Sequence, residues 1–496
     1  MERGDIPAKK KKMSEENNQD NLNEDRLLLC VFKNEEGEEH RGLLVYYHFT
    51  SKDLDDLLQQ ATSSDESLQC KYFIKDVEIN GTLSETLNQL ELAGTSSEVE
   101  IYYVPQAIFK VRAVTRCTST IEGHAEAILS VQFNPNGRYL ASGSGDTTVR
   151  FWDIYTESPQ YTCKGHKHWV LAIAWSPDGK TLASGCKNGL IMLWNPANGS
   201  QKGSPLKSHS KWITSLAWKP MHLDGKCRLL ASASKDGSIK IWDTVLSRCM
   251  MSLTSHTQSV TCVRWGGTNL IYSGSQDRTI KVWRASDGVL CRTLQGHGHW
   301  VNSMGLSCDY VLRTSCFDPA KANIVHETID LGEEAQQKLA LERYQKVVGS
   351  QPERLVTASD DLTMFLWTPE SSSKSVARLT GHMQVVNHVA FSPSTLYIAS
   401  ASYDKSIKLW NGRTGAFITT FLGHVQRVYQ VSWSADSRLL CSSSADSTLK
   451  IWNVERKKLL LDLGGHADEV YALDWSPDSQ RVASGGKDKV LKLWRQ

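Results

Sequence analysis

Histidine and aspartate side chains recur at fixed spacing along residues 105–496, and such pairs could carry out proton transfer or bind a metal ion. Eight histidines follow a glycine or a serine: His124, His166, His209, His256, His297, His382, His424 and His466. An acidic or amide residue then precedes a tryptophan by six positions: Asp146, Asn188, Asp236, Asp277, Asp361, Asp404, Asp446 and Asp488, before Trp152, Trp194, Trp242, Trp283, Trp367, Trp410, Trp452 and Trp494. Because every unit repeats the same set, we expect these residues to lock a fold rather than to catalyse a reaction.

Short strands must position these side chains. Alternating apolar runs such as 148–151 and 238–241 lie between clusters of Gly, Ser and Asp, which is typical of strands joined by tight turns. The units resemble WD-repeat propeller blades of four antiparallel strands, in which a Ser or Thr, the His and the Asp satisfy one another's hydrogen bonds beside the Trp. The sequence therefore predicts an all-β, eight-bladed WD-repeat β-propeller over residues 105–496.

Two units depart from the regular spacing. Met221 to Cys227 looks like a small loop insertion in the third unit, and 70 residues separate His297 from Trp367 in the fifth. Residues 331–348 are rich in Glu, Gln, Lys, Leu and Ala, which favours a helix. We therefore expect an insertion at about 309–350 that interrupts a turn rather than a blade.

The end of the chain predicts how the ring closes. Trp494 ends the third strand of the eighth unit, and the sequence stops two residues later. Residues 109–114, which precede the first Gly-His pair, alternate as a strand does. We expect this segment to supply the missing fourth strand, because a closed ring leaves no exposed strand edge.

The residues before the propeller divide into a tail and a small domain. Residues 1–25 are polar and predicted to be disordered, and Lys9 to Lys12 form a run that nuclear import machinery could read. Residues 26–104 predict strands at 27–32 and 43–47, a helix after Thr50, strands at 70–74 and 77–79, a Thr82–Glu85 capping box and a last strand at 99–104. This ββαββαβ order resembles a small α+β ubiquitin-like (β-grasp) domain.

Composition excludes several classes of protein. The sequence holds no run of 18 apolar residues and no signal-like segment near its start, so we expect no membrane association. Its 12 cysteines form no Cys-x-x-Cys pair, which argues against a zinc site and a disulfide framework and favours a reducing compartment. Without a phosphate-binding loop, a nucleophile elbow or a ligand cluster outside the repeats, we expect no enzymatic activity and no cofactor.

Charge separates the two parts of the chain. Residues 1–104 hold 11 basic and 22 acidic residues, a net charge of −11, whereas residues 105–496 hold 45 basic and 32 acidic residues, a net charge of +13. A basic propeller suits an acidic partner such as RNA or a ribonucleoprotein, and an acidic head suits a basic partner or a metal ion. The alternative is that these charges simply keep both parts in solution.

Three stretches carry a more specific resemblance: residues 104–117 at the junction, Ala141 to Asp153 in the first unit, and His466 to Tyr471 in the last. With the acidic head and the eight units, the chain resembles the Notchless family of large-ribosomal-subunit assembly factors over nearly all residues beyond the first 25. The resemblance implies a nuclear and nucleolar protein, monomeric outside the particle. Its propeller would dock on ribosomal proteins and rRNA of the large-subunit precursor.

The resemblance also implies a partner for the head. In this family the ubiquitin-like domain is gripped by the metal-ion-dependent adhesion site of midasin, an AAA-type ATPase that remodels the particle, and a Glu carboxylate completes the coordination of midasin's magnesium ion. The matching residue here is Glu78, favoured over Asp76. Val77 and Ile79, alternating inward on a strand, would turn Glu78 outward, although such a residue is usually just solvated.

Aromatic and basic residues interleave in the propeller loops around the Gly-His pairs and before each turn aspartate. They can stack on bases, pair with phosphates or anchor a protein helix, and the alternative is that each Trp packs between neighbouring blades. The candidate partner-binding residues are Trp169, Trp212, Trp300, Lys187, Lys211, Lys235, Arg427 and Lys487, with His168, His299 and Tyr403 beside them.

A second class of function is a signalling or ubiquitin-pathway adaptor, including a modulator of Notch signalling. In that case the head would recruit degradation machinery and the propeller would recognise a substrate. Val104-Pro105 continues straight into the propeller with no free Gly-Gly end, which argues against conjugation of the head to other proteins.

Overall fold

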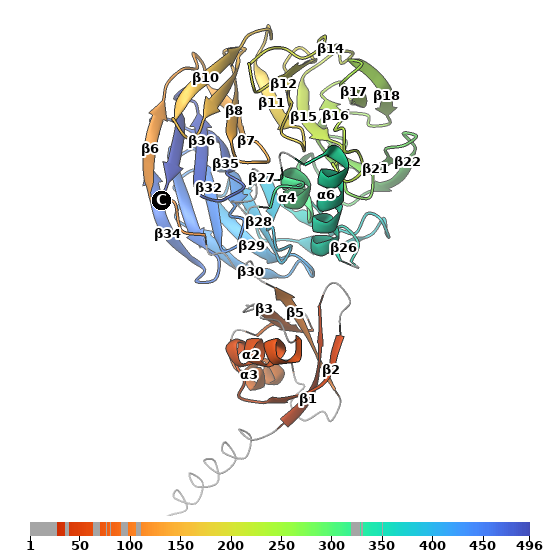
Figure 1. Cartoon of the computed structure of the whole chain (residues 1–496), viewed down its shortest axis with the longest axis vertical. Coiled ribbons are helices and arrows are strands. Elements are labelled where there is room, and N and C mark those ends of the chain that lie inside the picture. Colours follow the sequence, from red (N-terminus) through yellow and green to blue (C-terminus); the bar gives the residue numbers. More distant parts are fainter. Residues whose placement is uncertain are drawn as a thin grey trace, which may run out of the picture. The chain divides into compact units, whose positions relative to one another are not determined.

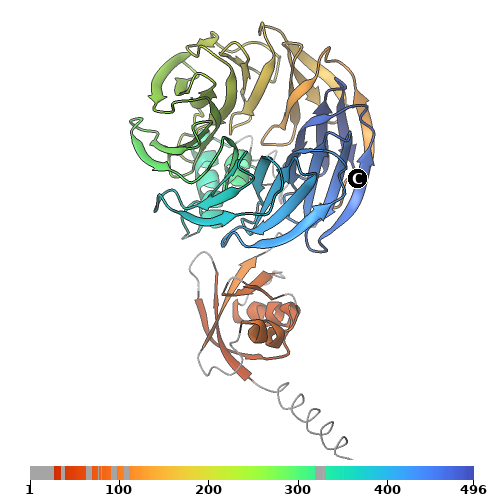
Figure 2. The ribbon, with the colours of Figure 1, turned by 180° about the vertical axis from the view of Figure 1, so that it is seen from behind.

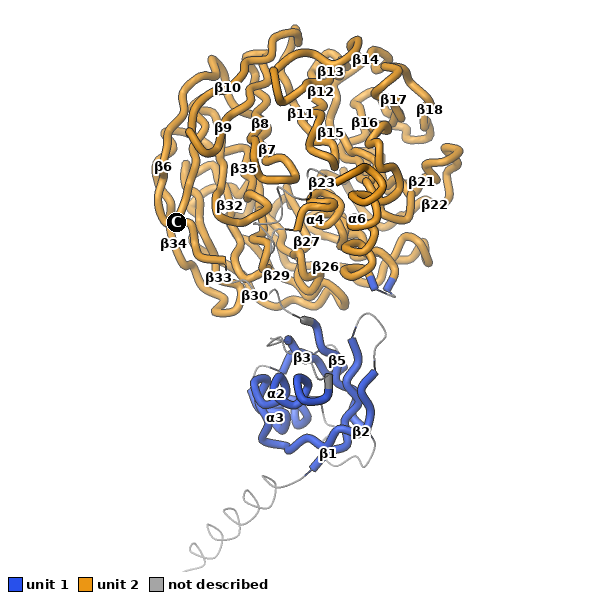
Figure 3. Tube along the Cα trace, viewed as in Figure 1, with its two compact units in different colours: residues 1–108, 349–351 blue, residues 109–348, 352–496 orange. Residues whose placement is uncertain are grey.

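The computed structural model describes residues 27–34, 39–62, 70–75, 77–79, 81–90, 98–105, 111–318, 328, 331–349 and 351–496. The chain divides into two compact units, one of Met1–Ile108 with Gly349–Gln351 and one of Phe109–Val348 with Pro352–Gln496 (Figure 3). The predicted tail at 1–25, the run Lys9 to Lys12 and Asp76 lie outside the described residues.

The N-terminal unit is a mixed five-stranded sheet with two helices. Its elements are β1 (Leu27–Lys33), β2 (Glu39–Tyr46), α2 (Ser51–Thr62), β3 (Cys70–Ile74), β4 (Val77–Glu78), α3 (Leu83–Gln89) and β5 (Val99–Pro105). The sheet order is β2-β1-β5-β3-β4, with β1 and β5 parallel and the other pairs antiparallel. The predicted ββαββαβ succession is confirmed, and the arrangement is that of a β-grasp domain.

Helix ends and apolar spacing explain this small unit. Thr82 accepts a hydrogen bond from the Glu85 amide, and the Glu85 carboxylate accepts one from the Thr82 amide, which confirms the predicted capping box. At the start of α2, the Asp53 carboxylate accepts from both the amide and the hydroxyl of Thr50. Leu54 and Leu58, one turn apart on α2, are fully buried against the sheet.

The second unit is a ring of eight four-stranded antiparallel sheets within the described residues (Figures 1 and 2). Blades 1 to 4 comprise β7 (Ile128–Phe133), β8 (Tyr139–Ser144), β9 (Val149–Asp153) and β10 (Ser158–Cys163); β11 (Val170–Trp175), β12 (Leu182–Cys186), β13 (Leu190–Trp194) and β14 (Leu206–Lys207); β15 (Ile213–Trp218), β16 (Leu229–Ser234), β17 (Ser238–Asp243) and β18 (Arg248–Thr254); and β19 (Val260–Trp265), β20 (Leu270–Ser275), β21 (Ile280–Arg284) and β22 (Leu290–Leu294).

Blades 5 to 8 comprise β23 (Val301–Leu306), β24 (Leu355–Ser359), β25 (Met364–Trp367) and β26 (Ser375–Leu379); β27 (Val386–Phe391), β28 (Tyr397–Ser402), β29 (Ser406–Asn411) and β30 (Phe417–Leu422); β31 (Val428–Trp433), β32 (Leu439–Ser444), β33 (Thr448–Asn453) and β34 (Lys458–Gly464); and β35 (Val470–Trp475), β36 (Arg481–Gly486), β37 (Leu491–Arg495) and β6 (Arg116–Ile121). The predicted eight-bladed propeller is confirmed.

The ring closes as expected, but through a different segment from the one predicted. The fourth strand of blade 8 is β6, which pairs with β37 so that Cys117 lies opposite Trp494, whereas residues 111–115 form no strand. Val114 is fully buried in a core cluster with Trp494, so its apolar character serves packing rather than strand alternation. The true outer strand is mostly polar because one face is solvated, and its sequence therefore gives a weak strand signal.

Tryptophans at the ends of the inner strands join neighbouring blades. The indole Nε1 of Trp175 donates to the Gln132 carbonyl of blade 1, and that of Trp218 donates to the Ala174 carbonyl of blade 2, each at 3.0 Å. These bonds satisfy a buried donor across these two blade interfaces. They make the ring a rigid support for the loops at its two faces.

The insertion in the fifth unit lies between β23 and β24, so it interrupts a turn and leaves the blade complete, as predicted. It holds α4 (Asp309–Thr314) and α6 (Glu333–Val348), and α6 matches the predicted helix. Figure 1 shows both helices on one face of the ring. Arg313 on α4 forms an ion pair with buried Asp474 of blade 8, and Tyr310 donates a 3.0 Å hydrogen bond to the Pro477 carbonyl.

The two departures from the repeat meet in space. Cys316, Phe317 and Ala340 of the insertion form a buried cluster with Met221 and Cys227 of the third unit. In addition, the ring of His222 stacks on that of Tyr344 at 4.4 Å, and Gln337 donates to the His222 carbonyl. The extra residues of blade 3 therefore help to seat the insertion of blade 5.

Candidate functional site

The eight histidines are structural, as the repeat predicts. In blade 1, His124 contacts Asp146 through Nδ1 at 2.7 Å and Ser142 through Nε2 at 2.7 Å, and Trp152 donates to the same Ser142 hydroxyl at 2.8 Å. Burial raises the pKa of the Asp146 carboxyl, but hydrogen bonds from His124 and Thr148 outweigh it and hold the pKa well below its usual range. Six further blades repeat this geometry, with Thr357 in place of the serine in blade 5.

Blade 2 is the exception because Asn188 replaces the aspartate. His166 still contacts the Ser184 hydroxyl at 2.6 Å, but its buried Nδ1 has no hydrogen-bond partner. Burial lowers the pKa of His166 to about 4, so the ring is neutral at physiological pH. This blade therefore lacks the histidine–aspartate part of the lock and the negative charge that the other seven blades place near the loops.

The loops around the histidines form one face of the ring, which we call the rim face. On it, the residue directly before each turn Asp or Asn donates its backbone amide to the carbonyl three residues after the histidine. These bonds join Gly145 to Ala127, Lys187 to Trp169, Lys235 to Trp212, Gln276 to Ser259, Asp360 to Trp300, Tyr403 to Val385, Ala445 to Arg427 and Lys487 to Glu469, at 2.9–3.0 Å. The fold thus presents eight equivalent pairs of backbone positions, and the residue at each position determines the chemistry of that pair.

Four of the predicted residues come together on blades 2 and 3. The Lys187 ammonium lies 4.5 Å from the ring centroid of Trp169 and 4.7 Å from that of Trp212, and the Lys235 ammonium lies 4.4 Å from that of Trp212. Trp169 is 50% exposed and Trp212 is 39% exposed, so neither ring is buried between blades. We call Trp169, Lys187, Trp212 and Lys235 the Lys–Trp ladder.

The other predicted rim residues lie apart from this ladder. Trp300, 42% exposed in blade 5, lies beside His299, whose Nδ1 is 3.4 Å from the Asp360 carboxylate. The Arg427 guanidinium lies 5.1 Å from the Tyr403 ring, and Lys487 pairs with Asp468 at 3.2 Å. Lys211 and His168 are exposed in the loops that carry the ladder tryptophans.

Sequence reasoning missed an aromatic group next to Tyr403. Tyr429 lies edge-on to Tyr403 at 6.0 Å and to Tyr471 at 5.4 Å, and its hydroxyl donates to the Glu469 carboxylate at 2.8 Å. Tyr429 and Tyr471 both stand five residues after a motif histidine. That recurrent position was the available signal.

Glu78 lies on the outer face of the N-terminal sheet. It pairs in register with Phe73, whereas Tyr72 and Ile74, on the opposite face of β3, belong to the core. The inward orientation expected of its neighbours holds for Ile79, which is buried, while Val77 is half-buried. The Glu78 side chain is 24% exposed, and its Oε1 accepts a hydrogen bond from Lys71 Nζ at 2.6 Å, a partner that sequence reasoning did not identify.

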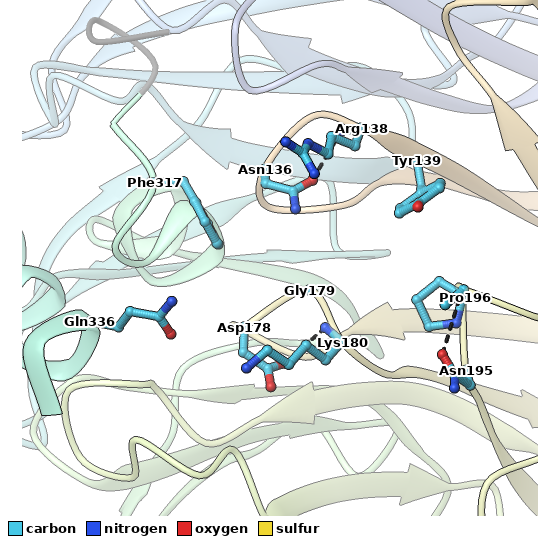
Figure 4. Close-up of a pocket in the computed structure, with 11 residues that line it drawn as sticks. Asn136, Arg138, Tyr139, Asp178, Gly179, Lys180, Asn195, Pro196, Phe317 and Gln336 are labelled. Atoms are coloured by element: carbon cyan, nitrogen blue, oxygen red, sulfur yellow. Dashed lines mark hydrogen bonds between the residues drawn. The ribbon is translucent and has the colours of Figure 1, made fainter. Parts of the chain in front are cut away.

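A small pocket lies where the insertion meets blades 1 and 2 (Figure 4). Its volume is about 190 Å³, and Phe317 and Gln336 of the insertion face Asn136, Arg138 and Lys180 of the blade loops. Arg138 and Lys180 bring positive charge, but Asp178 also lines the pocket and offsets part of it. Across the described ranges, we find no group of three or more His, Cys, Asp or Glu side chains that could hold a metal ion.

No helix in the part of the chain that the structure describes is long and apolar enough to cross a membrane.

Comparisons with known proteins agree with this fold. Residues 115–318 match the family model of the IFT122 first beta-propeller, and residues 373–411, 415–453 and 457–495 match the WD domain, G-beta repeat. Among solved structures, the computationally designed Ika8 protein superposes with a TM-score of 0.59 at 25% identity, covering 76% of this chain and 98% of its own. The protein is thus a WD-repeat propeller joined to a small N-terminal α+β domain.

Several relatives cover most of the chain. Protein Notchless of Drosophila melanogaster is 53% identical over 69% of this chain and 70% of its own length. Notchless protein homolog of Arabidopsis thaliana is 52% identical over 80% and 83%, and Ribosome assembly protein 4 of Saccharomyces cerevisiae is 49% identical over 70% and 68%. The chain belongs to the Notchless family.

Proposed function

We propose that this chain is a non-enzymatic assembly factor of the large ribosomal subunit, which links a precursor particle to an ATP-driven remodelling machine. Its propeller docks on proteins and rRNA of the particle in the nucleus and nucleolus. Its N-terminal domain offers Glu78 to the magnesium ion in the metal-ion-dependent adhesion site of midasin. The chain itself contributes binding surfaces, and the ATPase supplies the work.

Family membership carries the first half of this proposal. A relative named Ribosome assembly protein 4 shares 49% identity with the chain over 355 residues. The propeller also has the charge that an RNA-rich particle calls for, because residues 105–496 carry a net charge of +13. A rigid ring with eight equivalent rim pairs suits docking on a large surface better than enclosing a small substrate.

The position of Glu78 supports the second half. A ligand donated to another protein's metal ion must be a hard oxygen donor on an accessible surface, and Glu78 is a partly exposed carboxylate on the outer face of an edge strand. Lys71 holds this carboxylate in a defined direction before the partner arrives. A magnesium ion, with twice the charge of an ammonium, would then take over the oxygen from Lys71.

The proposal is tested by purifying the full chain with its bound particles, wild type beside Glu78→Ala. Glu100→Ala is the matched control, because Glu100 is also an outer-face carboxylate bonded to a lysine, Lys33, at 2.6 Å. We expect Glu78→Ala to lose midasin and to keep the particle, whereas Glu100→Ala keeps both. Equal recovery of midasin with all three proteins would refute Glu78 as the ligand.

The name of the Drosophila melanogaster relative favours a second candidate, an adaptor in signalling, including modulation of the Notch pathway. The same purification separates the two functions. Recovery of large-subunit precursor particles supports the assembly role, and recovery of membrane-receptor tails without ribosomal proteins or rRNA would replace it with the adaptor role.

A further inference from the structure

We propose that the Lys–Trp ladder of blades 2 and 3 binds an unpaired RNA strand, whose bases stack on Trp169 and Trp212 while its phosphates pair with Lys187 and Lys235. This inference rests on the proposed docking of the propeller on an RNA-rich particle. It goes further by assigning one rim segment and one conformation of RNA.

The ladder residues are held in place by the fold. Each lysine donates its backbone amide to the carbonyl of the tryptophan in its own blade at 2.9 Å, so the two pairs have the same backbone geometry. Lys187 Nζ lies 4.5 Å from the ring centroid of Trp169 and 4.7 Å from that of Trp212. Because one ammonium group contacts both rings, the two indoles are close neighbours. The result is an alternating row of aromatic, cation, aromatic and cation across two blades.

The local charge distinguishes this row from the rest of the rim face. Lys164, Lys167 and Lys211 are exposed in the loops that flank it, and Lys207 is exposed at the end of β14. Blade 2 carries Asn188 where the other blades carry an aspartate, so its loops hold one negative charge fewer. Glu126 of blade 1 bounds the positive arc at one end, next to Gly145 and Trp169.

Two other rim groups, at Trp300 and at Lys487, lack this combination. Trp300 lies next to His299, which is paired with the Asp360 carboxylate. Lys487 is already paired with Asp468. A phosphate approaching either group would meet a fixed negative charge. Blades 2 and 3 therefore accept a polyanion better than either of these two groups.

Open indole rings favour an unpaired strand over a duplex or an acidic peptide. A base offers a flat face to a partly exposed indole, and this contact tolerates any base. Paired RNA presents phosphates but hides its base faces, and an acidic peptide would use the lysines alone. The ammonium groups can swing from the indole faces to the phosphates as the bases arrive, because lysine side chains are long and flexible.

The test measures binding of a fluorescent oligouridine of about ten nucleotides to the full chain by anisotropy, at several salt concentrations. We expect the Trp169→Ala, Trp212→Ala double variant to bind at least about tenfold more weakly. Lys187→Gln should bind more weakly and lower the salt slope by about one. Trp300→Ala, which removes an equally exposed indole from the same face, should bind like the wild type.

Asn188→Asp separates charge from folding. The new carboxylate would directly follow Lys187 in the sequence and should weaken oligouridine binding about threefold. The thermal unfolding temperature should rise, because the buried His166 Nδ1 gains a hydrogen-bond acceptor. A purely structural role for this blade would predict no loss of RNA binding from a variant that is at least as stable.

Three results would overturn the inference. The first is equal binding of the oligouridine by the wild type and the double tryptophan variant. The second is an affinity of the wild type for duplex RNA of the same length that equals its affinity for the oligouridine. The third is displacement of the oligouridine by polyglutamate that carries the same number of charges. Particle recovery is scored separately. If the wild type recovers particles but the tryptophan substitutions do not weaken oligouridine binding, this inference alone is refuted. If the tryptophan substitutions weaken oligouridine binding but the wild type recovers no particles, the proposed function alone is refuted.

Discussion

Lys71 and Glu78 form an ion pair across neighbouring strands of the N-terminal sheet, with 2.6 Å between Nζ and Oε1. The pair is partly buried, at 15% and 24% side-chain exposure, so its two charges are positioned rather than freely mobile. The carboxylate that we assign to an external magnesium ion therefore already has a cation, and binding is an exchange of one cation for another.

This exchange predicts the effect of removing the lysine. Lys71→Met keeps much of the side-chain volume but removes the competing ammonium, and a pair of this kind contributes about 0.2–1 kcal/mol. We expect the variant to bind midasin's adhesion site up to about fivefold more tightly, as measured by isothermal titration calorimetry. Loss of binding to the level of a Glu78 variant would show instead that Lys71 itself contacts the partner.

The irregular lock of blade 2 predicts a stabilising substitution. Asn188→Asp would give the orphaned His166 Nδ1 the acceptor that the other seven histidines have at 2.7–3.0 Å. A hydrogen bond to a charged group contributes about 1.5–3 kcal/mol, and we expect a gain toward the lower end because the site is near the surface. The measurement is the free energy of unfolding in urea at neutral pH, and destabilisation would contradict the assigned role of the aspartates.

The seven aspartates predict how stability depends on pH. Burial opposes their ionisation, but hydrogen bonds from the histidines prevail, joined by a Thr or Ser side chain in six blades and by backbone amides at Asp488, so their pKa values in the folded state lie below the usual range. A lowered folded-state pKa stabilises the protein above the unfolded value, about 4, and this contribution is lost as the pH falls through the folded value.

We therefore expect the free energy of unfolding to fall steeply below about pH 4. Urea titrations at a series of pH values provide the measurement, and Asp404→Asn should show a shallower dependence because one titrating lock is missing. An unfolding free energy that stays constant down to about pH 2 would contradict this account.

The insertion predicts a strong coupling between two distant segments. Arg313 pairs with Asp474, which is buried and also accepts the Phe133 amide. Removing one partner of a fully buried pair costs about 3–5 kcal/mol, because the remaining charge is left unpaired, and the 27% exposure of the Arg313 side chain places this pair at the lower end. We expect Arg313→Met to destabilise the propeller by this order and Arg313→Met with Asp474→Asn to recover part of the loss. A loss in the double variant equal to the sum of the losses in Arg313→Met and in Asp474→Asn alone would show that the pair is not coupled.

Features repeated along the chain could be predicted from the sequence, and features made by tertiary contacts could not. The eight histidines revealed the blades because each repeats at a fixed offset from a tryptophan. The closing strand β6 was not predicted from the sequence, because its solvated face lacks the apolar alternation that marks a strand. The insertion helix α6 was evident from composition, but its contact with Met221 and Cys227 depends on the curvature of the ring.

The candidate sites show the same division. Outward placement of Glu78 follows from alternation along a strand, but its bond to Lys71 depends on the register between β3 and β4. Interleaved aromatic and basic residues marked the rim face. Trp169 and Lys187 belong to blade 2 and Trp212 to blade 3, and they form one ladder because the two blades are neighbours in the ring. The sequence of a single unit does not reveal such a contact between blades.

The most direct measurement of the central claim is the affinity of the purified full chain for the isolated metal-ion-dependent adhesion domain of midasin, with magnesium and with a chelator. Glu78→Gln is the decisive variant, since it keeps the shape of the side chain and removes the charge that the metal ion needs. We predict tight binding by the wild type and by Glu100→Ala with magnesium, and a loss of at least about a hundredfold with the chelator or with Glu78→Gln. Binding by Glu78→Gln that matches the wild type, or binding that ignores magnesium, would contradict the account.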